Sequence, residues 1–388
     1  MPDEVPGGFR RNPYHFGSPV ADPAHFADRE RELEKLRSLM LNGQNLILIA
    51  PRRYGKSSLL NRAVDDVRAS GGRTGKVSLI RCSTHKDVAE ELMRGVVHGP
   101  MSWLGGRVED LLQHLRRIRV TPEFTFDPNT GLVRGVRIAN LESTVSWRDL
   151  IGDVVRALGS IGDGDHPASF VLDEFQKVLE IDPDLPDVFK GLVDDLPQVS
   201  LVFAGSRRHL MERMANDPDH GALYNVGAKH YLAKVPERDF VAYLVRRAAE
   251  AGAELSASTA ARIYQIAAGV PNDVQLLAFF AFEQSGGGRI DDRAFDRALV
   301  SAVGDQQDEF ELAFGRLATS QQQLLKLIAE GGVRSFTNAA VLQPLGVTHA
   351  AARKAGAVLA DEGLIVHDED CWVMASGLMR AWLRGVAD

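Results

Sequence analysis

Nine residues between an apolar run and a helical pattern have the types needed to bind phosphate. The run Leu46–Ile49 stops at a loop that contains Gly55-Lys56-Ser57, and a helical pattern follows directly. Nucleotide phosphates need inward-facing backbone N–H groups above a helix N-terminus. Gly55 allows close approach of the backbone, Lys56 can reach the outer phosphates, and the Ser57 hydroxyl can ligate Mg²⁺. The predicted phosphate-binding residues are Ala50, Pro51, Arg52, Arg53, Tyr54, Gly55, Lys56, Ser57 and Ser58.

The first position of this loop departs from the usual phosphate-loop pattern. Ala50 stands where that pattern has glycine, which is a mild change because the close contact of the pattern lies at Gly55. A Gly-Lys-Ser sequence can also follow a buried strand by chance. A second motif is needed to decide between the two interpretations.

Two acidic residues supply that second motif. A strand-like run, Phe170–Leu172, ends in Asp173 and Glu174. In P-loop ATPases an acid at this point holds the Mg²⁺ water shell, and a following glutamate polarises the attacking water. The pair therefore predicts Asp173 and Ser57 as metal-binding residues and Glu174, with Lys56, as catalytic. An intact acidic pair argues against a module that binds nucleotide without hydrolysing it.

A third strand-like run, Val199–Ala204, leads to Ser206. If this strand lies between the two motif strands, the Ser206 side chain can contact the γ-phosphate or position water, so we count it as catalytic. The alternative is a helix N-cap. Arg207 and Arg208 follow; they could face nucleotide or solvent, and a solvated position is favoured.

Composition places the chain in a broad class. It has 388 residues, 45% hydrophobic and 25% charged, which suits two or three globular domains. A net charge of −7 argues against a protein that coats nucleic acid non-specifically. Two separated cysteines, Cys82 and Cys371, indicate neither a disulfide framework nor a zinc site. The N-terminal residues lack a signal-peptide core and no run suits a membrane span, so we expect a cytoplasmic protein without membrane contact.

The remaining patterns give the order of elements. They predict a helix from Asp28, a strand at 76–82, an inserted hairpin at about 120–140, a helix at 146–159, helices from 237 to about 308, a helix capped by Ser320, short and longer helices at 338–342 and 348–362, and a final hairpin at 364–374. Three helices followed by a hairpin are typical of a winged helix. This segment, 319–388, carries six Lys or Arg against seven Asp or Glu, which suits protein contact better than DNA contact.

Together these residues resemble the archaeal-type ATPases of the AAA+/STAND class. The resemblance rests on Asn12-Pro13 with Arg29-Glu30, on Pro51–Leu59, on Leu172–Gln176, on Gly205–Met211, on Leu223-Tyr-Asn225 and on Gly269–Gln275. It implies an α/β P-loop NTPase core (ASCE/AAA+-like) with a parallel sheet in 5-1-4-3-2 order, a helical lid and a C-terminal winged-helix domain. The expected domains are 12–235, 236–312 and 319–388. It also implies ATP and Mg²⁺ as cofactors, with Ser206 in the sensor position.

Two positions differ from the related sequences. Val226-Gly227 stands where an arginine commonly follows the Leu-Tyr box, and Asn272-Asp273 stands where AAA+ proteins often carry a second sensor arginine. Hydrolysis should therefore be slow without a partner. We expect an ATP-driven switch that acts through an unidentified protein partner, with oligomerisation left open. The alternative is a DNA-binding, initiator-like ATPase. A small-molecule kinase is disfavoured because no second substrate site is recognisable.

Overall fold

The computed structural model describes residues 10–20, 22–98, 120–126, 133–141, 146–159, 168–197, 199–368 and 370–386. Contacts divide the chain into two compact units. One comprises Glu30–Pro51 and Lys56–Leu232 and is called the α/β unit below. The other comprises the described residues up to Arg29, Arg52–Gly55 and Ala233 onward, and is called the helical unit.

The α/β unit is built on a five-stranded parallel sheet. Its strands are β1 (Leu46–Ile49), β2 (Arg73–Ser78), β5 (Ala168–Asp173), β6 (Val199–Gly205) and β7 (Ala228–Tyr231). They lie in the order β7-β1-β6-β5-β2, and every neighbouring pair is parallel. Without the inserted hairpin strands, this is the 5-1-4-3-2 order that the resemblance implied. The strand β6 lies between the two motif strands, β1 and β5.

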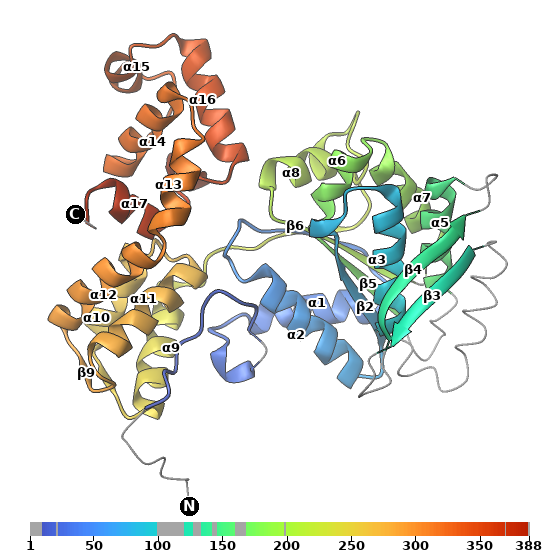
Figure 1. Ribbon diagram of the computed structural model, residues 1–388, viewed down its shortest axis with the longest axis horizontal. Helices are drawn as coiled ribbons and strands as arrows, with labels where there is room; N and C mark the ends of the chain where they lie inside the picture. Colours follow the sequence, from blue (N-terminus) through green and yellow to red (C-terminus); the bar gives the residue numbers. More distant parts are fainter. Residues whose placement is uncertain are drawn as a thin grey trace, which may run out of the picture. The chain divides into compact units, whose positions relative to one another are not determined.

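Helices cover both faces of this sheet. They are α1 (Glu30–Leu41), α2 (Lys56–Ala69), α3 (His85–His98), α5 (Trp147–Gly159), α6 (Val178–Ile181), α7 (Leu185–Asp195) and α8 (Arg208–Asn216), with 3₁₀ turns η2 (Leu79–Arg81) and η4 (Phe175–Lys177). Figure 1 shows α1 and α2 on one side of the sheet and the other helices on the opposite side. Right-handed crossovers require this division, because the chain moves one way from β1 to β2 and the other way afterwards. Alternate strand residues are therefore buried against different helices.

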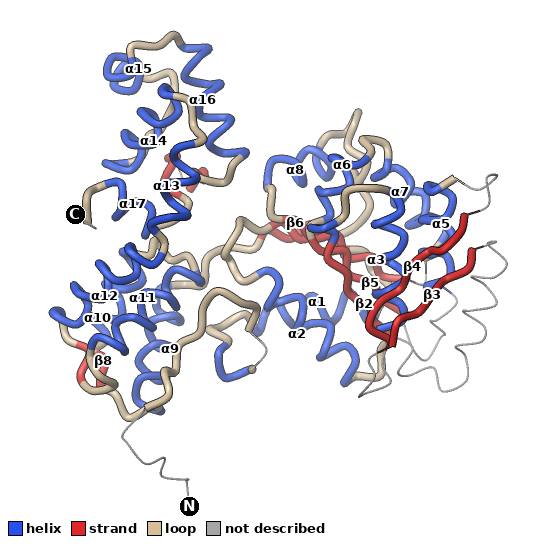
Figure 2. The backbone as a smooth tube through the Cα atoms, in the orientation of Figure 1, coloured by secondary structure: helices blue, strands red, loops and turns tan. Residues whose placement is uncertain are grey.

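A separate hairpin is inserted between α3 and α5. Its strands β3 (Val120–Phe126) and β4 (Val133–Leu141) are antiparallel and pair only with each other among the described strands. Figure 2 shows the two strands beside the parallel sheet and outside it. The backbone N–H of Ile138 donates to the Glu90 carboxylate of α3 at 2.8 Å. The hairpin was predicted, and its turn chemistry at 127–131 lies outside the described residues.

Two predicted boundaries in this unit are wrong. The second strand was expected at 76–82, but β2 ends at Ser78 and the apolar residues after it form η2. The apolar pattern does not distinguish a longer strand from a strand followed by a 3₁₀ turn, because Leu79 would be buried in either case. The first helix was expected from Asp28 and begins at Glu30. Asp28 and Arg29 have φ of 56° and 100°, outside the helical region.

The helical unit contains most of the remaining helices. They are η1 (Pro23–His25), α9 (Glu237–Glu250), α10 (Ala257–Ile266), α11 (Pro271–Gln284), α12 (Asp292–Asp305), α13 (Gln307–Gly315), α14 (Thr319–Gly331), α15 (Ala339–Leu345), α16 (His349–Asp361) and α17 (Gly377–Leu383). Short strands β8 (Glu254–Leu255) and β9 (Arg289–Ile290) pair with each other. One hydrophobic core runs from Tyr14 through these helices to Ala381.

The tail has the element order that the sequence predicted. The helices α14, α15 and α16 precede a hairpin of β10 (Ile365–Asp368) and β11 (Cys371–Met374), and α17 follows. The helix predicted from Thr348 begins at His349, and Thr348 is its N-cap. Ser320 was expected to cap α14, but Ala318 is the N-cap, and its N–H donates to the Gln321 side chain at 2.9 Å. The Gln321 side chain therefore satisfies the N–H of the N-cap residue, which is the glutamine half of a capping box.

None of the helices formed by described residues combines the length and the apolar character needed to cross a lipid bilayer. The cytoplasmic location remains a prediction.

Candidate active site

Strand register brings the ends of the three motif strands together. Ile49 at the end of β1 pairs with Gly205 of β6, and Ala204 of β6 pairs with Asp173 of β5. The N–H of Ala50 donates to the Gly205 carbonyl at 3.2 Å and extends the ladder by one residue. Ligands bind beyond the carboxyl ends of such strands in open α/β sheets. The polar residues that follow these strands therefore share one edge of the sheet.

Lys56 is the central cation of this edge. It is the first residue of α2 and is only 5% exposed. Its ammonium donates to Asp173 Oδ1 and lies 2.8 Å from Glu174 Oε1. The predicted lysine thus contacts both predicted acids. An ammonium at this point can also bind phosphate oxygens, for which it is a compact point charge.

Ser57 and Asp173 form a hard-oxygen pair that fits Mg²⁺. The Ser57 hydroxyl donates to Asp173 Oδ2 at 3.2 Å. Mg²⁺ in such sites takes one or two protein oxygens, substrate phosphates and water. Among the described residues, no group of three His, Cys, Asp or Glu could hold a metal ion. A serine hydroxyl and one carboxylate suit a metal that shares its coordination with a nucleotide.

Glu174 is held by three side chains. Its Oε2 accepts hydrogen bonds from the Ser206 hydroxyl at 2.6 Å and from the Gln176 amide at 2.7 Å, and its Oε1 faces Lys56. Its backbone has φ 57° and ψ 40°, the left-handed region, which is costly for a glutamate and turns the chain sharply after β5. Strain of this kind is common at functional sites.

Both acids are held ionised. Burial raises the pKa of Asp173, but the ammonium groups of Lys56 and Lys76 outweigh it, so the pKa lies below its usual value. Burial likewise raises the pKa of Glu174. Lys56 and the hydrogen bonds from Ser206 and Gln176 reverse that effect. At neutral pH Glu174 is a carboxylate and can accept a proton or a hydrogen bond from water.

Two residues of the site were not predicted. The Lys76 ammonium, on β2, lies 3.4 Å from Asp173 Oδ2 and donates to Asn61 at 2.7 Å. Gln176 is 3% exposed and donates to Glu174. A lysine inside a strand pattern was the available signal for Lys76, but its partner depends on the pairing of β2 with β5. Gln176 lies in one of the motifs that carry the resemblance, and its spacing alone indicated no role.

The interpretation of Ser206 as a helix cap is wrong. Arg207 is the N-cap of α8, and the Ser206 hydroxyl donates to Glu174 instead. Arg207 and Arg208 are ion-paired at the surface as expected, at 2.8 Å from Glu180 and Glu212 respectively. The catalytic role of Ser206 remains a prediction, and its contact with Glu174 is the observation that favours it.

The other loop residues lie in different surroundings. Ala50 is fully buried and has no positive φ, which explains why a residue other than glycine fits there. Gly55 has φ 82°, a value that glycine adopts readily.

Pro51, Gly55 and Ser58 are partly buried, and Arg52 is exposed. Tyr54 is buried in the helical unit, where its carbonyl accepts from Arg29 at 3.5 Å. Arg53 contacts acids of the helical unit.

Comparisons with known proteins support the fold. The structure is similar to the Walker-type ATPase PABY2304 of Pyrococcus abyssi, with a TM-score of 0.67 and 18% identity, covering 95% of this chain and 98% of that one. It is similar to the ORC2 protein of Aeropyrum pernix in ADPNP–ADP complexes, with a TM-score of 0.54, 16% identity, and 94% and 93% coverage. It also resembles the ORC1 protein of Aeropyrum pernix in complex with DNA, with a TM-score of 0.50, 14% identity, and 94% and 95% coverage.

No protein-family model and no curated protein sequence matches the chain. At identities below 20% the structural likeness establishes the fold and leaves the activity to the site itself. The parallel order β7-β1-β6-β5-β2 and the motif residues at its carboxyl edge agree with that likeness. The chain has an α/β P-loop NTPase fold, similar to that of these archaeal proteins.

Proposed function

We propose that the chain binds ATP with Mg²⁺, hydrolyses it slowly, and uses the cycle as a conformational switch whose output is a protein contact. The observation that carries the proposal is the state of Glu174. It is ionised, oriented by Ser206 and Gln176, and 2.8 Å from Lys56. A carboxylate held this way beside a phosphate-binding lysine suits a base that orients water.

Each residue of the site has a separate task in this reaction. Lys56 binds the outer phosphate oxygens, for which it exchanges its present carboxylate partners. Ser57 and Asp173 hold Mg²⁺, which when bound neutralises charge on the phosphates. Glu174 accepts a hydrogen bond from the attacking water and orients it. Ser206 keeps the Glu174 carboxylate aimed and is close enough to the same edge to contact a terminal phosphate.

Slow turnover follows from the missing arginines. Phosphoryl transfer builds charge on the transferred group, and an arginine commonly stabilises it. Neither Val226-Gly227 nor Asn272-Asp273 supplies one at the positions where related sequences have it. An arginine from a protein partner or from a second copy of the chain would then accelerate hydrolysis. This dependence suits a switch better than a motor.

Substituting Glu174 with glutamine tests the proposal. The amide cannot accept the proton, so steady-state phosphate release at saturating ATP should fall by about 100-fold or more. Affinity for a fluorescent ATP analogue should stay within about threefold, because Lys56 and Ser57 are unchanged. Glu180→Gln is the matched control, since Glu180 is an exposed acid on α6, shortly after Glu174, and pairs with Lys177 and Arg207 at the surface. Hydrolysis at the wild-type rate in Glu174→Gln would contradict the proposed role, and absence of ATP binding in the wild type would contradict the proposal itself.

A second candidate is a DNA-associated ATPase. It is favoured by the exposed Arg353 and Lys354 on α16, the third helix of the tail, and by the likeness to an ORC1 protein solved in complex with DNA. Helix three is the element that enters the major groove in winged-helix DNA readers. The near balance of acidic and basic residues in 319–388 makes this the weaker of the two candidates.

A further inference from the structure

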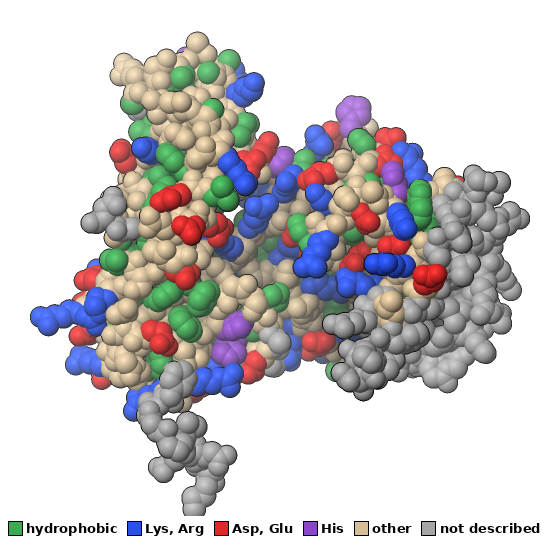
Figure 3. All heavy atoms as spheres, in the orientation of Figure 1, with side chains coloured by type: hydrophobic (Ala, Val, Ile, Leu, Met, Phe, Trp, Pro, Cys, Tyr) green, Lys and Arg blue, Asp and Glu red, His purple; other side chains and the backbone are tan. Residues whose placement is uncertain are grey.

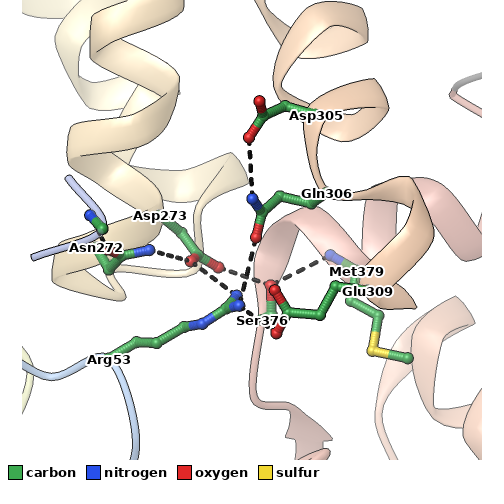
Figure 4. Close-up of polar contacts among 9 residues, drawn as sticks. Arg53, Asn272, Asp273, Asp305, Gln306, Glu309, Ser376 and Met379 are labelled. Carbon is green, nitrogen blue, oxygen red and sulfur yellow. Dashed lines mark hydrogen bonds and ion pairs between the residues drawn. The ribbon is translucent and has the colours of Figure 1, made fainter. Parts of the chain in front are cut away.

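Arg53, in the middle of the phosphate loop, is held by side chains from distant parts of the helical unit (Figure 4). Its Nη1 lies 3.6 Å from Asp273 Oδ1. Its Nη2 donates to Glu309 Oε1 at 2.6 Å and to Gln306 Oε1 at 3.3 Å. The main chain is held too, because the N–H of Asn272 donates to the Arg53 carbonyl at 3.3 Å. Both the side chain and the backbone of Arg53 are therefore fixed.

Asp273 is the buried centre of this group of contacts. Its side chain has no solvent exposure. Besides Arg53, it accepts hydrogen bonds from the Ser376 hydroxyl at 2.6 Å and from the Asn272 amide at 3.5 Å. A carboxylate removed from water is stable only with such partners. Burial raises the pKa of Asp273, and Arg53 is the only cationic partner among the described residues that opposes this, so moving Arg53 would destabilise the buried carboxylate.

Ser376 extends the group to the last helix. It is the N-cap of α17, and its hydroxyl also accepts from the Met379 N–H at 3.2 Å. The next residue, Gly377, packs so closely that a Cβ would lie 2.0 Å from the Ile266 carbonyl of α10. The start of α17 is therefore fixed in position. Arg53 thus connects the phosphate loop with α11, α13 and α17.

The backbone of Arg53 needs this support. Its φ is 68°, in the left-handed region that residues other than glycine seldom adopt. Such a conformation persists only where the surroundings fix it. Phosphate loops bind their ligand with main-chain N–H groups, so the path of the main chain sets their affinity. Arg53 lies three residues before Lys56 in that loop.

We propose that Asp273, Glu309 and Ser376 are positioning residues that hold the phosphate loop in its binding conformation through Arg53. This inference rests on the proposed nucleotide binding. It adds that the occupancy of the loop and the order of α17 are coupled. Coupling between two sites is reciprocal. If the contacts around Asp273 strengthen nucleotide binding by some factor, bound nucleotide must strengthen those contacts, and so the start of α17, by the same factor.

The first test measures affinity for a fluorescent ATP analogue. Asp273→Asn keeps the size of the side chain and removes its charge, and should weaken binding about tenfold. Glu309→Ala should weaken it about threefold, because this partner is largely exposed. Asp308→Ala is the matched control, with the same charge change one residue away on α13 and an exposed side chain. The Asp308 variant should bind like the wild type.

The second test measures hydrogen exchange of the α17 amides with and without the analogue. Nucleotide should slow exchange several-fold in the wild type and have no such effect in Asp273→Asn. Ser376→Ala should lose the response, and Ser376→Thr, which keeps a hydroxyl, should restore it. A purely structural role of these contacts would change exchange equally in the presence and absence of nucleotide.

The outcomes separate this inference from the proposed function. If the wild type binds no nucleotide, the proposed function fails. If it binds nucleotide but α17 exchange does not respond, or if Asp273→Asn binds as tightly as the wild type or more tightly, the coupling is overturned. Should Asp273→Asn fail to fold, equal affinities of Glu309→Ala and Asp308→Ala overturn it just as clearly.

Discussion

Charged residues of the α/β unit are grouped rather than scattered, and Asp182 shows this outside the active site. It lies after α6 and is 7% exposed. Its Oδ2 is 2.8 Å from His85 Nε2 at the start of α3 and accepts from Arg148 Nε of α5 at 2.6 Å. One carboxylate therefore ties three helical segments together. Burial raises its pKa, but His85, the Asp184 N–H and Arg148 together lower it to about 2.

This pKa gives a prediction about stability and pH. A carboxyl group whose pKa is lower in the folded state stabilises the fold above its unfolded pKa, about 3.9, and loses that contribution as pH falls toward 2. Asp182→Asn should lower the free energy of unfolding by about 2 kcal/mol at pH 7, from the loss of charge-assisted hydrogen bonds. The difference from the wild type should shrink below pH 4. Urea unfolding across this range measures both.

Asp194→Asn serves as the control, because Asp194 is exposed on α7 and its side chain pairs with no other described residue. It should change the free energy of unfolding by less than about 0.5 kcal/mol at every pH. An Asp182→Asn effect that stayed constant down to pH 3 would mean that the carboxylate charge is not what binds the helices together.

The sequence predicted most residues of the active site, but it did not predict all of them. Lys56, Ser57, Asp173 and Glu174 belong to motifs whose local spacing reflects their chemistry, and the structure brings them together. Lys76 could not be identified in this way. Its contact with Asp173 exists because β2 pairs with β5 in one register, and no local pattern encodes that pairing.

Arg53 illustrates the same limit. Its position in the loop suggested a phosphate ligand, whereas its guanidinium contacts Asp273 and Glu309, which follow it by more than 200 residues. The sequence did show that Asp273 replaces a residue that is often basic, and this reversal of charge was the available signal. The sequence did not indicate that Arg53 is the partner of Asp273, because the two residues meet only in the folded chain.

At the scale of elements, close packing joins α3 to the sheet. Gly95 of α3 has no room for a side chain, because a Cβ would lie 2.3 Å from Val77 Cγ1 and 2.8 Å from the Phe170 ring. Gly75 of β2 faces it, and a Cβ there would lie 2.9 Å from the Gly95 carbonyl. These two glycines let α3 approach β2 and β5 closely. Since β5 ends in Asp173, this packing also supports the site.

Gly95→Ala should therefore destabilise the fold. Val77 and the Phe170 ring are both buried and cannot move aside cheaply, so we expect a loss of about 1–3 kcal/mol in the free energy of unfolding. Gly191→Ala is the matched substitution, since Gly191 lies in α7 and a Cβ there would have no described neighbour within 4 Å. At that position, alanine should stabilise by up to about 1 kcal/mol through its higher helix propensity. Urea unfolding midpoints of the two variants should shift in opposite directions, and a shift in the same direction would refute the packing argument.

Element prediction succeeded where one periodicity ran to a clear stop and failed where two elements shared one pattern. Helix α9 begins at Glu237 as predicted, after Pro236. The run through β2 and η2 has no such stop, since Leu79 and Cys82 continue the apolar pattern after Ser78. The boundary is set by tertiary structure, because Ser78 is the last β2 residue paired with β5.

At the scale of the whole molecule, the distribution of charge favours one of the two proposed functions over the other. The tail has six basic residues, and three are already used inside the helical unit. Arg380 donates to the carbonyls of Gln265 and Ile266, and Arg384 to those of Ala329 and Glu330. Lys326 lies 5.4 Å from the centre of the Phe314 ring. On the face shown in Figure 3, the tail helices display mainly uncharged atoms.

Arg334, Arg353 and Lys354 are the basic residues of the tail that make none of these contacts, and all three are exposed. Three contacts would give a slope of about −2.7 in a plot of log affinity against log salt concentration, which is weak for a DNA-binding protein. We therefore expect no saturable binding to duplex DNA at physiological salt with protein up to about 10 μM. Fluorescence anisotropy with a labelled duplex measures this, with and without an ATP analogue.

The double substitution Arg353→Ala and Lys354→Ala makes the test decisive. If protein contact is the output, the pair can be removed without a change in ATP affinity or hydrolysis, and anisotropy stays flat for both proteins. If DNA is the output, the wild type binds and the substitution lowers the salt slope by about two, because two phosphate contacts are lost. Binding that persists with an unchanged slope would place any DNA contact outside α16, and the winged-helix interpretation of this tail would lose its main functional support.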